Sequence, residues 1–311
     1  MGQSESDSLS PAKICCRCCG SRNLRHLGTK TGLFVKSNFD FYLCQGCSFQ
    51  FVEPVTDFSI YNDAYYAGRG PDVSVDYERE YRNDFASPRM LEFQDLLRIA
   101  RNHLDRSPHD NSVEWLDFGC GTGGFLRFLS SNPTELVRPS AVLKITGYDV
   151  GSYVTRLSGS DAFQVVDLDA LNRMTGAFDV ISCIEVLEHL PEPRPVLQLL
   201  SRLLKPGGLL ILTTGNMQSP IAKFRGLSFG YRVPEIHVSF FNPALLESLY
   251  REAGLSPLHV KFRGTVRFRI AKKLRLHPVM RIFAPLALLS PFVAMADFLY
   301  GTSAMPCAVK Q

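Results

Sequence analysis

The stretch of sequence that decides the fold is Trp115-Leu-Asp-Phe-Gly-Cys-Gly-Thr-Gly-Gly-Phe-Leu126. An apolar run that ends at Phe118 predicts a buried strand, and the glycines after it predict a tight turn that leads into a helix. Glycines at this place let a ligand approach the backbone closely at the N-terminus of the helix. Their spacing is Gly-x-Gly-x-Gly, which differs from the Gly-x-Gly-x-x-Gly pattern of dinucleotide-binding proteins.

Around this stretch, short apolar runs alternate with amphipathic segments. Strands are expected over residues 113–118, 141–148, 163–166, 178–184 and 209–213, and helices over residues 124–130 and 195–204. Strands that alternate with helices pair in parallel through right-handed crossovers. The sequence therefore predicts an α/β fold with a doubly wound sheet.

Three aspartates end successive predicted strands: Asp117, Asp149 and Asp167. A carboxylate at Asp117 would repel a pyrophosphate but can bind an amine, one at Asp149 can accept from both hydroxyls of a ribose, and Asp167 is expected to meet an adenine amine. The alternative is that each carboxylate only caps a loop. Three of them beside a glycine turn, at the edge where open α/β sheets bind ligands, favour S-adenosylmethionine over NAD as the ligand.

Cysteines are concentrated near the N-terminus, where six of the nine are found. Two Cys-x2-Cys pairs supply the candidate metal ligands, which are Cys16, Cys19, Cys44 and Cys47. Four thiolates suit a structural zinc ion without an open coordination position. Between the two pairs, apolar and polar residues alternate over residues 24–43, as in a small β ribbon. Cys15 and Cys18 form an overlapping pair, which leaves the register open, and the alternative to a metal site is a group of reduced thiols.

Over roughly residues 115–255, the chain resembles the class I S-adenosylmethionine-dependent methyltransferases. Besides the glycine turn, the resemblance rests on Phe178-Asp-Val-Ile-Ser-Cys-Ile-Glu-Val-Leu-Glu-His-Leu190, Leu203-Leu-Lys-Pro-Gly-Gly-Leu-Leu-Ile211, His237-Val-Ser-Phe-Phe241 and Leu245–Gly254. It implies methyl transfer from S-adenosylmethionine on a Rossmann-like, seven-stranded sheet that is closed by an antiparallel edge strand at residues 303–310.

The expected organisation has four parts. They are a disordered tail (1–10), a zinc-ribbon-like segment (11–55), a helical connector (56–110) and a methyltransferase domain (111–311) with a helical insertion at about 270–300. The resemblance also implies the cofactor-binding residues, which are Asp117, Gly119, Gly121, Gly123, Asp149, Asp167 and Cys183. Asp117 and the glycines would line the methionine end of the cofactor, Asp149 the ribose and Asp167 the adenine.

The candidate catalytic residues are Glu185, Glu188, His189 and His237. The first three are spaced i, i+3 and i+4, so that one helical turn would place them on one face. This pattern resembles the Glu-x-x-Glu-His motif of ubiquinone-pathway and small-RNA 2′-O-methyltransferases. The resemblance implies a divalent ion, magnesium or zinc, that lowers the pKa of an acceptor hydroxyl, with His237 completing the site. The alternative is a helix-opening Glu-His without an ion, where His189 or His237 acts as general base.

The predicted function is methyl transfer from S-adenosylmethionine to a hydroxyl of a small-molecule biosynthetic intermediate. Two alternatives stay open: C- or N-methylation of a sugar or natural product, and a zinc-dependent protein that binds or modifies RNA. The chain has 34 basic and 30 acidic residues among 311, which gives a net charge of +4. A surplus of this size does not by itself attract nucleic acid, so no nucleic-acid partner is expected.

The C-terminal stretch predicts a further contact. Basic residues between Lys261 and Arg281 run into an apolar segment at 282–296, which suits the surface of a membrane or a lipid-linked substrate. The alternative is a pair of helices that packs over the substrate cleft. The polar N-terminus resembles no secretory signal, and no apolar run is long enough for an ordinary membrane span. The expected location is cytoplasmic, with peripheral membrane contact as an option.

Overall fold

The computed structural model describes residues 14–70, 77, 81–82, 89–106, 112–133, 142–157, 159–260 and 307–311. The predicted tail at 1–10, the basic and apolar stretch at 261–296 and the predicted insertion at 270–300 lie outside the described residues. Within these ranges, every helix falls short of the length and hydropathy that a membrane span requires.

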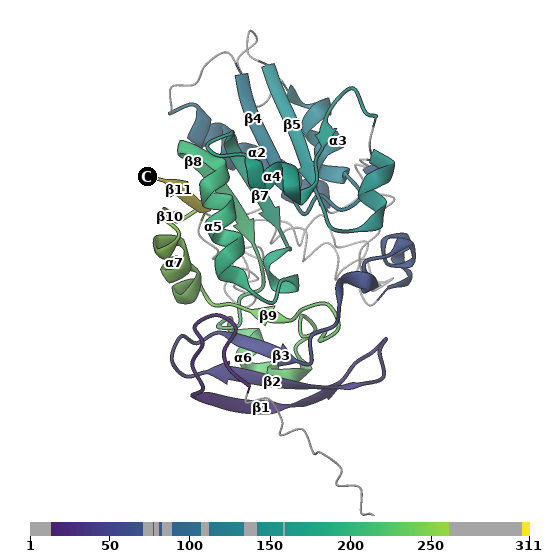
Figure 1. Cartoon of the computed structure of the whole chain (residues 1–311), viewed down its shortest axis with the longest axis vertical. Coiled ribbons are helices and arrows are strands. Elements are labelled where there is room, and N and C mark those ends of the chain that lie inside the picture. The colour runs from purple at the N-terminus through teal and green to yellow at the C-terminus, as the bar shows by residue number, and fades with distance from the viewer. Residues whose placement is uncertain are drawn as a thin grey trace, which may run out of the picture.

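A seven-stranded sheet forms the upper part of the molecule in Figure 1, with the strand order β10-β11-β8-β7-β4-β5-β6. The strands are β4 (Ser112–Phe118), β5 (Val142–Tyr148), β6 (Gln164–Val165), β7 (Phe178–Ile184), β8 (Leu204–Thr213), β10 (Leu255–Leu258) and β11 (Cys307–Lys310). Strand β4 pairs in parallel with β5 on one side and with β7 on the other. The strand order therefore reverses at β4, and ligands bind at such a switch point.

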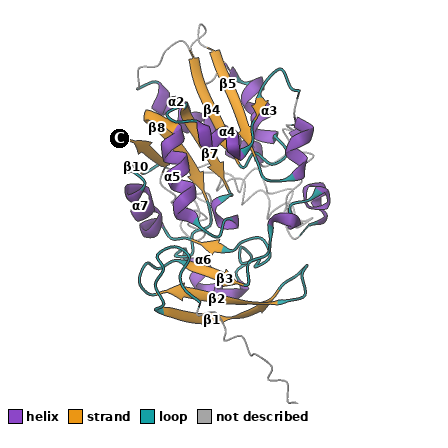
Figure 2. Cartoon of the chain, in the orientation of Figure 1, coloured by secondary structure: helices purple, strands orange, loops and turns teal. Residues whose placement is uncertain are grey.

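Helices cover both faces of this sheet, as Figure 2 shows. They are α2 (Arg89–Leu104), α3 (Gly124–Ser131), α4 (Leu168–Arg173), α5 (Pro193–Leu203) and α7 (Pro243–Glu252). Helix α6 (Pro220–Arg225) packs instead against the small sheet described below, where its Ala222 joins Phe41 and Phe240 in one core. Trp115 packs with α2 and α3, whereas its neighbour Leu116 belongs to the core that α5 and α7 cover. Successive strand residues point to opposite faces, so both faces of β4 are buried. The predicted doubly wound, Rossmann-like sheet is confirmed.

The largest differences from the prediction are two element starts and one strand position. Strand β8 begins at Leu204 rather than at residue 209, and α5 begins at Pro193 rather than at Pro195. Strand β11 is antiparallel to β8, as expected, but it lies between β8 and β10. The prediction of an edge strand at 303–310 is therefore wrong, because β10 takes the edge position.

A second, antiparallel sheet lies below the first in Figure 1. Its order is β1-β2-β3-β9, with β1 at Leu24–Thr31, β2 at Asn38–Cys44, β3 at Gln50–Glu53 and β9 at Ser239–Phe240. The first three strands confirm the predicted N-terminal ribbon. The fourth strand, β9, comes from the distant segment between α6 and α7 and pairs with β3 through Gln50–Phe240 and Phe51–Ser239. The ribbon and the α/β part thus share one sheet.

Candidate active site and cysteine cluster

The glycine turn after β4 is bound to the end of β5. Gly119 has a φ of 85°, its N–H donates to Tyr148 O at 2.7 Å, and a Cβ there would lie 2.3 Å from Val186 Cγ2. Only glycine fits such a close approach in the left-handed region. Gly121, with a φ of 53°, donates its N–H to Asp149 Oδ2 at 2.8 Å. The turn therefore holds the Asp149 carboxylate at the carboxyl end of β5.

Asp149 has further donors on its other oxygen. Its Oδ1 accepts from the N–H of Gly151 at 2.7 Å and from the hydroxyl of Tyr66 at 3.0 Å. Tyr66 is buried and belongs to the helical turn Tyr65–Arg69. The carboxylate thus already accepts a hydroxyl proton, which is the interaction a ribose would offer. Tyr66 was not identified from the sequence as a partner of Asp149. The one feature of the sequence that could have indicated it is the high density of tyrosines between residues 61 and 66.

The other predicted cofactor residues occupy distinct environments. Asp117 is buried, and its Oδ1 accepts from Ser182 Oγ at 2.7 Å, across the β4–β7 pair. Asp167 is the N-cap of α4, where its Oδ1 accepts from the N–H of Ala170 at 2.7 Å. Cys183 is fully buried in β7, and Gly123 is the left-handed N-cap of α3. Their roles toward a cofactor stay predictions.

Three of the four predicted catalytic residues converge. Glu188, His189 and His237 each offer a ligand atom, and these atoms lie within 4.8 Å of one another. We call these three residues the acceptor cluster. Glu188 and His189 lie in the 3₁₀ turn Leu187–His189, which follows β7, and His237 directly precedes Val238 and β9. The cluster therefore joins the loop after β7 with the segment between β8 and β9.

Glu185 departs from the predicted geometry. Its φ is 53°, a left-handed conformation that non-glycine residues rarely adopt. The single helical turn expected for Glu185, Glu188 and His189 is therefore not formed. Glu185 lies beside the cluster instead of within it, with its Oε2 3.3 Å from the hydroxyl of Tyr231. Strain of this kind, on the order of 1–3 kcal/mol, is concentrated at functional sites.

Both histidines of the acceptor cluster have one ring nitrogen bound to the backbone. His189 Nδ1 lies 2.9 Å from Ile236 O, and His237 Nδ1 lies 2.5 Å from Tyr231 O. Because a carbonyl only accepts, each Nδ1 carries the proton and each Nε2 keeps its lone pair. Burial, reinforced by the neighbouring His237, lowers the pKa of His189 to about 3. His189 is therefore neutral, which is the form that binds a metal ion.

Glu188 supplies the carboxyl oxygens of the cluster. The Tyr231 hydroxyl donates to Glu188 Oε1 and accepts from the N–H of Gly215 at 2.7 Å. Glu188 Oε2 is buried and has no hydrogen-bond partner among the described residues. Burial, and then the charge of Glu185, raise the pKa of Glu188 well above its ordinary value. A cation at this oxygen would relieve that cost, and one carboxylate with two imidazoles is a suitable donor set for a divalent ion.

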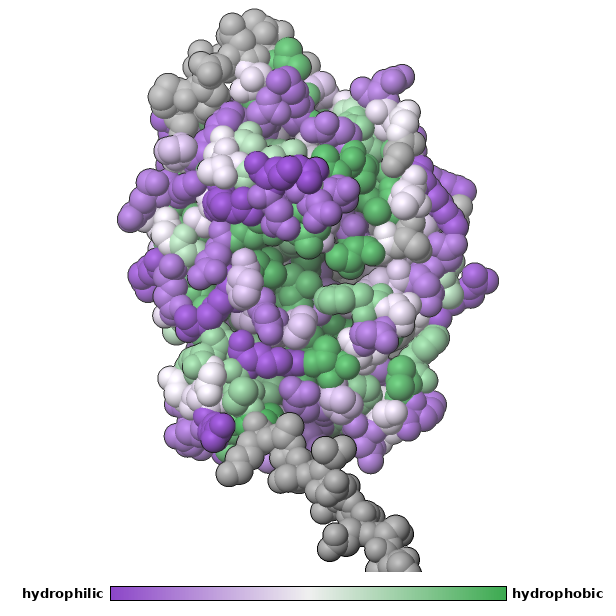
Figure 3. Space-filling view, viewed as in Figure 1, coloured by the Kyte–Doolittle hydropathy of each residue, from purple (hydrophilic) through white to green (hydrophobic). Residues whose placement is uncertain are grey.

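Two contacts place the acceptor cluster beside the glycine turn. Val186, two residues before Glu188, packs on Gly119. The tyrosine segment bridges both places, since Tyr61 Oη lies 2.7 Å from His189 Nδ1 while Tyr66 donates to Asp149. Apolar residues also gather near the centre of the face that Figure 3 shows. The glycine turn with Asp149 and the acceptor cluster therefore lie next to each other.

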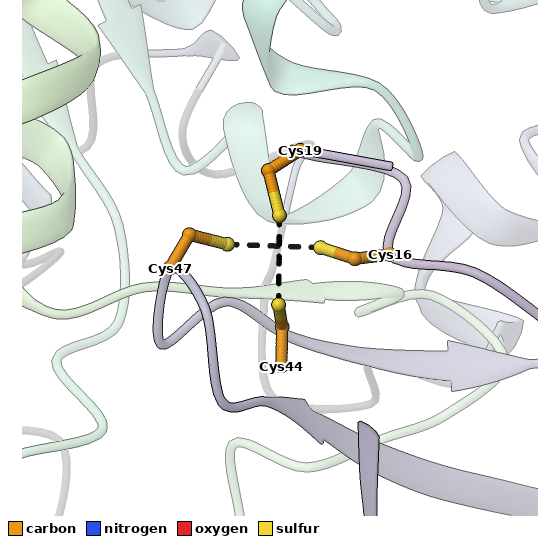
Figure 4. A group of neighbouring side chains, drawn as sticks. All are labelled: Cys16, Cys19, Cys44 and Cys47. Carbon is orange, nitrogen blue, oxygen red and sulfur yellow. Dashed lines mark hydrogen bonds between the residues drawn. The ribbon is translucent and has the colours of Figure 1, made fainter. Parts of the chain in front are cut away.

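The four predicted cysteine ligands also converge. Cys16, Cys19, Cys44 and Cys47 have sulfur atoms within 4.8 Å of one another, and the four side chains point to a common centre in Figure 4. The sulfur distances are 3.7 Å for Cys16–Cys47 and 3.5 Å for Cys19–Cys44. Tetrahedral zinc with Zn–S bonds of about 2.3 Å requires about 3.8 Å. Cys15 is exposed and Cys18 lies outside the group, which settles the register.

Comparisons with known proteins agree with this geometry. A family model described as a methyltransferase domain matches residues 90–260. A ubiquinone biosynthesis O-methyltransferase of Pseudomonas aeruginosa is 31% identical over 176 residues, which is 52% of this chain and 72% of that protein. A protein of the same name from Burkholderia pseudomallei is 27% identical over 190 residues, or 58% of this chain and 80% of that protein.

Among solved structures, a SAM-dependent methyltransferase from Archaeoglobus fulgidus is 14% identical, with a TM-score of 0.42, and the match covers 75% of this chain and 96% of that one. The assignment rests on the family model and on the curated relatives. The glycine turn, the strand order and the match over more than half of the chain lead to one conclusion: the chain belongs to the class I S-adenosylmethionine-dependent methyltransferases.

Proposed function

We propose that this enzyme transfers a methyl group from S-adenosylmethionine to a hydroxyl of a small-molecule biosynthetic intermediate. The observation that carries the proposal is the convergence of Glu188, His189 and His237 next to the glycine turn. The curated relatives are named as O-methyltransferases, which supports a hydroxyl acceptor. Oxygen needs help as a nucleophile, because its proton must be removed or its pKa lowered.

The cofactor side of the site is formed by the glycine turn and the aspartates. Gly119, Gly121 and Gly123 keep the backbone free of side chains where the methionine end of the cofactor would lie. Asp149 would accept from the ribose hydroxyls, in the way that it now accepts from Tyr66. In-line alignment of the sulfonium methyl with the acceptor oxygen is the main catalytic requirement of such a transfer.

On the acceptor side, the three residues of the acceptor cluster would hold a divalent ion. When bound, such an ion lowers the pKa of the acceptor hydroxyl, so that its oxygen attacks at neutral pH. Glu188 would neutralise part of the positive charge of the ion, while Tyr231 orients the Glu188 carboxyl group. The imidazoles of His189 and His237 are each oriented by a backbone carbonyl at Nδ1. Without an ion, His237 Nε2 would accept the hydroxyl proton.

The cysteine cluster has a different role in this proposal. Its four sulfur atoms match the ligand set and the distances of a structural zinc ion. A site with four protein ligands leaves no coordination position for a substrate. We therefore propose zinc at this cluster, with about one ion per chain, and assign the chemistry to the acceptor cluster alone.

Chelation tests this division of roles. The enzyme is assayed on phenol, catechol and sugar-hydroxyl acceptors, with and without EDTA, while elemental analysis follows its zinc content. We expect EDTA to remove activity, magnesium or zinc to restore it, and the cysteine-bound zinc to stay, because four thiolates hold zinc more tightly than three mixed ligands. If EDTA leaves the activity unchanged, the proposal of a divalent ion at the acceptor cluster is wrong. If the product is methylated on carbon or nitrogen, the proposal of a hydroxyl acceptor is wrong.

A further inference from the structure

The segment Tyr231–Phe240 carries two groups of the active site, Tyr231 and His237, yet it has little regular structure of its own. Within it, only Ser239–Phe240 forms a strand. Its internal hydrogen bonds are short-range turns, such as Ile236 N to Val233 O at 3.1 Å and His237 N to Val233 O at 2.8 Å. The position of His237 therefore depends on what packs against this segment.

The N-terminal ribbon packs against the segment along most of its length. At one end, Glu235 Oε1 accepts from the N–H groups of Phe34 at 2.6 Å and Val35 at 3.3 Å, both in the β1–β2 turn. Lys30 Nζ donates to Arg232 O at 2.5 Å. The Arg232 side chain donates to Gln50 Oε1 at 2.6 Å. Four ribbon residues thus fix the part of the segment that precedes His237.

The strongest attachment lies directly after His237. Arg17 Nη2 lies 3.0 Å from Val238 O and 3.0 Å from Val52 O, so one guanidinium donates to backbone on both sides of the contact. The Val52 N–H donates to the same Val238 oxygen at 3.2 Å, next to the β3–β9 pair, whose strand β9 is the edge of the second sheet nearest the first sheet in Figure 1. The Arg17 side chain is only 14% exposed and lies over the Phe51 ring.

Arg17 also connects the two clusters. It lies between Cys16 and Cys19 in the sequence, so the first cysteine pair determines where its side chain begins. The Val238 carbonyl that it holds adjoins His237, and the Val238 N–H donates to Glu188 O at 2.8 Å. One residue, Val238, is thereby bonded to the cysteine ribbon on its carbonyl side and to the acceptor cluster on its amide side.

We propose that the cysteine ribbon is a positioning device for the acceptor cluster, with Arg17 as its positioning residue. Arg17 fixes Val238, and Val238 in turn fixes His237 and the backbone of Glu188. An ion held by the four cysteines would therefore support the geometry of the active site without taking part in the chemistry. This inference rests on the proposed function, since it assumes that the acceptor cluster acts on the acceptor.

The direct test observes the histidine itself. NMR spectra of protein labelled with ¹³C and ¹⁵N in histidine are recorded for the wild type, for Arg17→Ala and for Arg22→Ala, an exposed arginine of the same ribbon. A His237→Gln spectrum identifies the His237 signals. We expect Arg17→Ala to shift or broaden these signals and Arg22→Ala to leave them in place. Unchanged His237 signals in Arg17→Ala would overturn the proposal.

A kinetic comparison separates positioning from a general loss of folding. For Arg17→Ala we expect kcat to fall by about 10²-fold, the scale that a displacement of about 1 Å produces. The KM for S-adenosylmethionine and the zinc content should stay at their wild-type values. Arg17→Lys, which keeps the charge but donates to fewer carbonyls, should recover part of kcat. An equal loss of kcat in Arg22→Ala would contradict the assignment.

The outcomes also distinguish this inference from the proposed function. The NMR measurement needs neither an acceptor nor a divalent ion. If the Arg17 variants move the His237 signals while His237→Ala stays active, the positioning holds and the catalytic role of His237 fails. If Arg17→Ala does not fold, Arg17→Lys provides the same NMR test, and unchanged His237 signals there, together with an unchanged kcat, would overturn the positioning role.

Discussion

The two ligand clusters of this molecule differ in the number, kind and origin of their ligands. The cysteine cluster has four sulfur ligands, all from the ribbon, in two pairs of close sequence spacing. The acceptor cluster has one oxygen and two nitrogen ligands, from Glu188, His189 and the distant His237. Four protein ligands complete a tetrahedron, whereas three leave room for a substrate atom. The first has the form of a structural site and the second that of a reactive one.

The difference extends to what each cluster should affect when it is damaged. Loss of a ligand at the closed cysteine cluster should lower the stability of the ribbon. Loss of a ligand at the open acceptor cluster should lower the rate of methyl transfer and leave the fold intact. The glycine turn is a third region, and damage there should affect the affinity for the cofactor. Each of the following variants replaces a residue in one of these regions, and the quantity measured is the one that this region should affect most.

The largest expected effect is on stability. Replacing a buried ligand of the cysteine cluster, Cys44→Ser, should lower the free energy of unfolding by about 4 kcal/mol or more, the scale of losing a structural metal. Urea unfolding followed by circular dichroism measures this change, and elemental analysis measures the zinc. The control is Cys15→Ser, an exposed cysteine outside the cluster. If both variants unfold at the same urea concentration, the structural role is wrong.

The next effect is on turnover. His237→Ala should lower kcat by about 10²-fold or more, because a lost general base or ion ligand costs this much. The assay uses whichever acceptor the wild-type enzyme methylates. The control is His259→Ala, since His259 is exposed and contacts only Glu247 in the ion pairs of the described residues. An active His237→Ala enzyme would show that proximity alone activates the acceptor, and the O-methyl assignment would lose its main support.

The sequence predicted what short-range patterns encode. The strands, the glycine turn and the aspartates at strand ends follow from apolar runs and glycines within a few residues of one another. In the structure, the N–H of Gly121 in this turn donates to the Asp149 carboxylate at the end of β5. Tyr66 and Tyr231 were missed, because their contacts with Asp149 and Glu188 join segments far apart in the chain. The pairing of β9 with the ribbon was missed for the same reason.

Two predictions were wrong for physical reasons that the structure shows. The predicted helical turn through Glu185 assumed a right-handed backbone. Because Glu185 has a left-handed backbone conformation, the i, i+3, i+4 spacing does not place Glu185 on the same helical face as Glu188 and His189. The edge position predicted for residues 303–310 was wrong because β10 adds to the far side of β11. The cysteine register could not be read from the sequence, since Cys15 and Cys18 have the same spacing as Cys16 and Cys19.

We expect the glycine turn and Asp149 to hold the cofactor independently of the acceptor cluster. Calorimetric titration of S-adenosylmethionine into the wild type, Asp149→Ala and His237→Ala tests it without any acceptor. We expect His237→Ala to bind as the wild type does, and Asp149→Ala to bind more weakly by ~1.5–3 kcal/mol, the scale of a lost hydrogen bond to a charged group. Equal affinity in Asp149→Ala and the wild type, or loss of binding in His237→Ala, would contradict the account.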